Sequence, residues 1–97
     1  MATYVVLLNF TDQGARSVGD SPKRYEAFKA VAEKLDVQIK GIYWTVGAYD
    51  IVTTLEGSED AVTAALLKLG TAGNVRTQTL RAFSQDEFSR MLKKVPQ

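Results

Sequence analysis

The sequence predicts an α+β fold in which two helices cover one face of a four-stranded antiparallel sheet. Short apolar segments rich in β-branched residues alternate with helical periodicity in the order βαββαβ, and a further helix follows. A short turn at residues 47–49 joins the middle two strands. The 97 residues leave room for one core, so we predict a single domain over residues 1–97. This pattern is typical of a ferredoxin-like sheet with right-handed crossovers and strand order 4-1-3-2.

The first strand is predicted at residues 4–10. Apolar side chains occupy both the odd and the even positions there, which indicates burial on both faces. The following connection, residues 11–20, is longer than most, and we expect a helical turn that begins at Thr11. Ser21 as N-cap and Pro22 at the first helical position then begin a helix. Its apolar stripe consists of Tyr25, Phe28, Val31, Ala32 and Leu35.

The second strand is predicted at residues 37–46 and the third at residues 50–56. Simple alternation places Val37, Ile39 and Tyr43 on one face of the second strand, and Ile42, Trp44 and Val46 on the other. Tyr43 and Trp44 therefore point to opposite faces. One of them should join the core, and the other should line a cavity or a subunit contact.

The second helix should begin at Ser58, whose cap is followed by two acids that suit the positive end of the helix dipole, and it should end at Gly70. Residues 74–83 form the predicted fourth strand. Residues 84–87, Ser-Gln-Asp-Glu, form a capping box that begins a short last helix. The apolar positions of that helix are Phe88, Met91, Leu92 and Val95.

Composition excludes several classes of function. Twelve basic and eleven acidic residues leave a net charge of +1, which argues against a dedicated nucleic-acid binder. The RNA-recognition motif shares this strand order, but residues 51–55 supply none of its basic or stacking aromatic side chains. The chain has no cysteine and no histidine, so we predict no metal site and no cofactor. It lacks an apolar run of 18 residues and a basic leader, so we expect a cytoplasmic protein without membrane contact.

Candidate ligand-binding residues converge at one end of the predicted fold. The turn at residues 47–49, the hinge at residues 70–73 and the start of the 11–20 connection all reach that end. The candidates there are Tyr49, Asp50, Arg76, Arg16, Lys23 and Arg24. Arg76 would bind an anionic or carbonyl group that Tyr49 and Asp50 orient. The alternative is a structural ion pair between Asp50 and Arg76.

Lys23 and Arg24 lie at the amino end of the first predicted helix, where the dipole disfavours cations. They either complete an anion site at that helix terminus or are solvated residues of a tolerant first turn. Arg16 lies in the preceding connection and adds positive charge to the same end.

The second face of the sheet also needs a cover, because the first two strands are apolar on both sides. The last helix, with about 11 residues and a length of roughly 16 Å, is too short to shield that face. Large exposed apolar faces usually mark interfaces. We therefore predict a homo-oligomer, a dimer or a larger assembly, formed through the open sheet face.

Several segments together resemble the GYD domain family. They are Gly-x-Tyr-Asp at residues 47–50, YVVLLNFT at 4–11, SPKR at 21–24, GNVRT at 73–77 and LRAF at 80–83. The resemblance extends over about residues 3–92, and the variable position of the signature is Ala48. It implies a small bacterial or archaeal protein related to dimeric α/β barrels, and it implies little about a reaction.

Three hypotheses for function follow. The first is a homo-oligomeric small-molecule-binding module with its site at the Tyr49/Asp50/Arg76 end. The second is a cofactor-independent enzyme of the oxygenase or isomerase type, by analogy with similar barrels. Its acid–base group would have to be Asp50 or a tyrosine. The third is a purely structural assembly unit.

Overall fold

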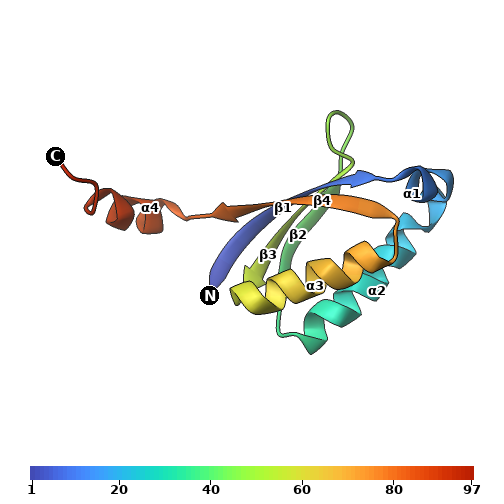
Figure 1. Cartoon of the computed structure of the whole chain (residues 1–97), viewed down its shortest axis with the longest axis horizontal. Coiled ribbons are helices and arrows are strands. Elements are labelled where there is room, and N and C mark those ends of the chain that lie inside the picture. The colour runs from blue at the N-terminus through green and yellow to red at the C-terminus, as the bar shows by residue number, and fades with distance from the viewer.

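The computed structural model describes residues 1–97 and contains one four-stranded antiparallel sheet with the order β2-β3-β1-β4. The strand order, the α+β class and the ferredoxin-like arrangement predicted from sequence are confirmed (Figure 1). The elements are β1 (Ala2–Phe10), α1 (Asp12–Arg16), a 3₁₀ turn (Val18–Asp20), α2 (Ser21–Lys34), β2 (Gln38–Trp44), β3 (Ile51–Gly57), α3 (Glu59–Thr71), β4 (Val75–Ala82) and α4 (Gln85–Leu92).

The core lies between the sheet and the two long helices, α2 and α3, which pack against one face (Figure 1). Alternate residues of β1 and β3 point into it, because successive strand side chains point to opposite faces. Val6 and Leu55 are fully buried, and Val62 on α3 meets them from the helix side. Ser58 caps α3 as predicted, with its side chain accepting the amide of Ala61.

The helical turn predicted at Thr11 is confirmed as α1. The Thr11 hydroxyl accepts the Gly14 amide (3.1 Å) and donates to the carbonyl of Gly73 (2.6 Å). The Thr11 amide donates to the carbonyl of Asn74 (3.0 Å), and Gln13 donates to the Asn74 side chain (3.0 Å). These bonds fasten α1 to the link between α3 and β4.

The predicted facing of the second strand is wrong in part, because β2 contains an irregularity between Ile39 and Gly41. Ile39 pairs with Leu55 and Ile42 with Thr53, so both face the helices, although their spacing of three predicts opposite faces. The extra residue at the bulge exchanges the faces to which the odd and even positions after it point. Trp44 therefore shares the helix side with both isoleucines, and Tyr43 lies on the open face.

The predicted N-cap of the first long helix is also wrong. The cap position belongs to Asp20, and Ser21 is already within α2. The reason is a tertiary contact: Ser21 is buried, and its hydroxyl accepts a hydrogen bond from the indole of Trp44 (2.9 Å). Pro22 remains in the first turn, where its missing amide costs nothing.

The capping box of the last helix is confirmed at Ser84 and Glu87, each of which accepts the other's backbone amide. Hydrogen bonds from the Ser84 amide and then its hydroxyl lower the pKa of Glu87, because they favour its charged form. The helix itself, α4, lies away from the rest of the molecule at the end of β4 (Figure 1). The radius of gyration, 15.0 Å, reflects this shape, since a compact chain of this length has about 12.5 Å.

The open face of the sheet has no cover within the chain, because α4 does not fold back over it (Figure 1). Val5, Leu7 and Val52 occupy its centre and are half-buried. Tyr43 and Leu80 flank them on the outer strands, with 70% and 44% of their surfaces exposed. We call these five residues the open-face patch. None of the helices is long and apolar enough to cross a membrane.

Candidate functional site

Asp50 holds the hairpin of β2 and β3 against β1. Its amide donates to the carbonyl of Leu8 (2.9 Å), and its carboxylate accepts the amide of Phe10 (2.8 Å). Its carbonyl accepts the amide of Thr45 across the hairpin (2.8 Å). The side chain thus supplies an acceptor for the Phe10 amide at the place where the pairing of β1 with β3 has ended. The carboxylate is bonded to β1 rather than to Arg76.

A group of polar side chains lies at the same end, on the open face. The Tyr49 hydroxyl donates to the side chain of Gln78 on β4 (3.0 Å), and Asn9 donates to the carbonyl of Ala48 (2.8 Å). Asn9 is the register partner of Arg76, so the two side chains emerge on one face about 5 Å apart at Cβ. Arg76 is exposed. We call Asn9, Tyr49, Arg76 and Gln78 the polar corner.

The structure brings Tyr49, Asp50 and Arg76 to the same end of the sheet, with β1 between the last two. Asn9 and Gln78 were missed from sequence. Their only signal was the pairing register of β1 and β4, which places Asn9 opposite Arg76 and Gln78 opposite Leu7. Arg76 and Asp50 are separated by two strand spacings, roughly 10 Å between backbones.

The other predicted basic residues lie around α1 and the start of α2. Arg16 and Lys23 are exposed. Arg24 is half-buried and donates to the carbonyl of Ser17 (3.0 Å), to its hydroxyl (3.1 Å) and to the carbonyl of Gly14 (3.2 Å). Arg24 therefore organises the connection between α1 and α2, and it is not part of the polar corner.

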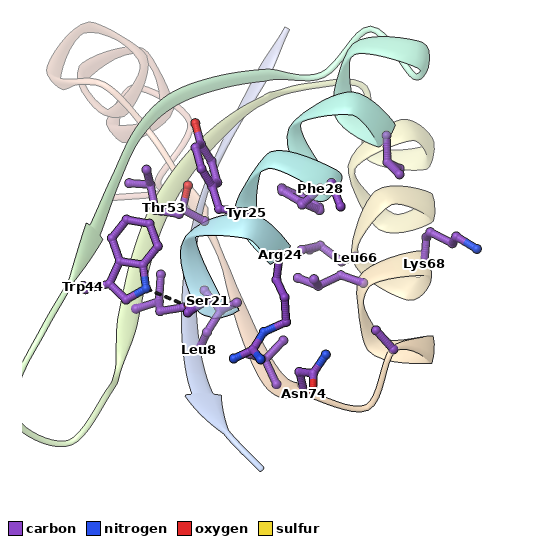
Figure 2. A pocket seen from close by; sticks show the side chains of 17 residues that line it. Leu8, Ser21, Arg24, Tyr25, Phe28, Trp44, Thr53, Leu66, Lys68 and Asn74 are labelled. Atoms are coloured by element: carbon purple, nitrogen blue, oxygen red, sulfur yellow. Dashed lines mark hydrogen bonds between the residues drawn. The ribbon is translucent and has the colours of Figure 1, made fainter. Parts of the chain in front are cut away.

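A second feature, a cavity of about 210 Å³, lies between α2, α3 and the helix-facing side of the sheet (Figure 2). Tyr25, Phe28 and Leu66 line it from the helices, and Trp44 lines it from β2. The rings of Tyr25 and Trp44 meet edge to face at 6.1 Å. Sequence reasoning missed this cavity, because the bulge that places Trp44 on this side leaves no clear local signal. The structure contains no cluster of three or more carboxylates that could hold a metal ion.

Comparison with solved structures shows the fold in known proteins. The feast or famine regulatory protein of M. tuberculosis, complexed with L-methionine, is similar over 88% of this chain with a TM-score of 0.65 and 20% identity. This chain spans about half of that regulator, 52% of its length. A second similar structure is the protein FFRP-DM1, with a TM-score of 0.61 and 20% identity. The aligned part covers 86% of this chain and 100% of FFRP-DM1. These likenesses establish the fold alone.

Comparison of sequences shows a relative over nearly the whole chain. The glutamine synthetase and cystathionine beta-lyase binding protein of Thermus thermophilus is 34% identical over 96 residues, which cover 96% of this chain and 100% of that protein. The GYD domain model matches residues 4–92. The chain therefore belongs to the GYD domain family, as its signature segments indicated.

Proposed function

We propose that this chain is a homo-oligomeric small-molecule-binding protein that holds an anionic or carbonyl-bearing ligand at the Tyr49/Asp50/Arg76 end. The observation that carries the proposal is the exposed Arg76 within the polar corner. Asp50, the acid of the Gly-x-Tyr-Asp signature, accepts a hydrogen bond from β1 instead. An arginine with unused donors suits a carboxylate or a carbonyl oxygen.

The signature residues have different roles in this proposal. Arg76 binds the ligand, and Tyr49 and Asn9 orient it from either side. Asp50 fixes the hairpin that carries Tyr49, because it anchors that turn to β1. Arg16 and Lys23 add positive charge at the same end, which favours the approach of an anion. The polar corner lies at one end of the open face. Assembly through the open-face patch would therefore place the polar corner at the rim of the interface.

The first test is the substitution Arg76→Gln. A charged hydrogen bond contributes about 1.5–3 kcal/mol, so the affinity for pyruvate should fall roughly 10- to 100-fold. Pyruvate carries both a carboxylate and a carbonyl, and amide chemical shifts of Asn9, Tyr49 and Gln78 would report its binding. The control is Arg90→Gln on α4, which should leave the affinity unchanged. Equal affinities in all three proteins would contradict the site.

A specific observation also favours a protein partner. The relative that is 34% identical is named for binding glutamine synthetase and cystathionine beta-lyase. We propose that this chain likewise binds a metabolic enzyme, with the oligomer as the scaffold. Glutamine synthetase of the same host, mixed with this chain at micromolar concentration, should sediment as a heavier complex. Independent sedimentation of both this enzyme and the host's cystathionine beta-lyase would contradict the partner proposal and leave the ligand proposal unaffected.

A further inference from the structure

We propose that the cavity between α2, α3 and the sheet is a second ligand site, which takes a small apolar acid. The ligand class is an aromatic or branched aliphatic body with one carboxylate. This site is separate from the polar corner, because it opens on the helix side of the sheet. Successive residues of β1 show the separation: Leu8 lines the cavity, and Asn9 belongs to the polar corner.

The size and walls of the cavity define the body of the ligand. Its volume is about 210 Å³, and an engineered apolar cavity of about 150 Å³ is known to take benzene. The space therefore suits one ring with a short substituent. Twelve of its 17 lining residues are hydrophobic. Such a surface favours an apolar guest over water.

The buried hydroxyls of the wall are already satisfied. Ser21 accepts the Trp44 indole (2.9 Å), as the dashed line in Figure 2 shows. Thr53 donates to the carbonyl of Gly41 (2.7 Å). Both residues are 5% exposed. Because both hydroxyls already have partners within the protein, the lining leaves few groups that need a hydrogen bond from a ligand. The ligand body should therefore be hydrocarbon.

Arg24 provides the polar end. Figure 2 shows its side chain extending toward the part of the pocket where Asn74 lies. The guanidinium is fixed by three hydrogen bonds to Ser17 and Gly14. A guanidinium has five N–H donors, so two remain for a ligand. A carboxylate is the acceptor that matches these remaining donors.

The same lining set argues against an amino acid. No aspartate or glutamate is among the 17 lining residues. The ammonium group of a zwitterion would therefore enter an apolar site without a counterion, which is unfavourable. Phenylacetate should bind at least 10-fold more tightly than L-phenylalanine. Phenylacetamide, which lacks the charge, should also bind about 10-fold more weakly than phenylacetate.

The chain contains its own reporter for the test. Trp44 is the only tryptophan and is partly exposed at the cavity. Titration with phenylacetate should give a saturable blue shift of its emission, because the bound ring displaces water from the indole. Amide shifts of Thr53 and Val31 provide an independent measurement. Isovalerate tests the branched aliphatic class in the same way.

A matched pair of variants on α2 locates the site. Ala27 is exposed and lies at the edge of the cavity, so Ala27→Phe should obstruct it and weaken phenylacetate binding at least 10-fold. Ala30 is exposed on the same helix and does not line the cavity, so Ala30→Phe should bind as the unaltered protein does. Absence of a saturable response up to 10 mM phenylacetate, or equal weakening by both variants, would overturn the proposal. Trp44, Thr53 and Val31 line the cavity on the helix side of the sheet, so this outcome is read at the cavity and is independent of the polar corner on the open face.

Discussion

Replacing Leu7 by lysine should dissociate the assembly proposed for this chain. Leu7 lies at the centre of the open-face patch, between Val52 on β3 and Gln78 on β4. In a two-fold symmetric interface, each substitution appears twice. A buried unpaired charge costs about 3–5 kcal/mol, so each lysine should weaken association at least about 100-fold.

The folded subunit should survive this change. Leu7 points away from the core, whereas its neighbours Val6 and Leu8 point into it. The long stem of lysine can also lie along the sheet with its charge in water when the subunit is alone. Circular dichroism and the thermal transition should therefore still report a folded chain.

Sedimentation velocity at micromolar concentration is the decisive measurement. The unaltered protein should sediment with a mass at least twice the chain mass of 10.7 kDa, and Leu7→Lys should sediment at the chain mass. Leu67→Lys is the matched control, because Leu67 is an exposed leucine on α3, 68% accessible and distant from the open face. A monomeric unaltered protein, or an unchanged mass after Leu7→Lys, would remove the proposed interface.

Features that act over a few residues could be predicted from this sequence. The caps at Ser58 and Ser84 act within three residues, so their chemistry is visible locally. The helical turn at Thr11 belongs to the same class. The strand order followed from the element order, because crossover handedness restricts the possible sheets.

Features that depend on distant contacts could not be predicted. The carboxylate of Asp50 accepts an amide that lies 40 residues away, at Phe10, and nothing near Asp50 in the sequence specifies that partner. The bulge near Lys40 determines the side of the sheet on which Trp44 lies, and that position in turn decided the environment of Ser21. The cavity arises from imperfect filling between the helices and the sheet, which a periodicity argument does not measure.

Gly14 provides the strongest expected effect on stability. A β-carbon at this position would lie 2.0 Å from the carbonyl oxygen of Asn74, which is backbone and cannot rotate away. The Thr11 amide holds that same carbonyl at 3.0 Å, so α1 and the α3–β4 link would have to separate. Such overpacking costs about 3 kcal/mol.

The sign of the effect is informative, because Gly14 lies within α1. Helix propensity alone predicts that Gly14→Ala stabilises the chain by about 1 kcal/mol. The clash should exceed this gain and leave a net loss of about 2 kcal/mol. For a domain of this size, the melting temperature should fall by roughly 8–16 °C.

Gly19→Ala is the matched control. A β-carbon at Gly19 would meet nothing within 4 Å, and the backbone there does not have a positive φ. Its substitution should raise stability by about 0.4–1 kcal/mol, because it restricts the unfolded chain. The two alanine variants should therefore shift the melting temperature in opposite directions. If Gly14→Ala melts at or above the unaltered protein, α1 is not held against the link at Asn74.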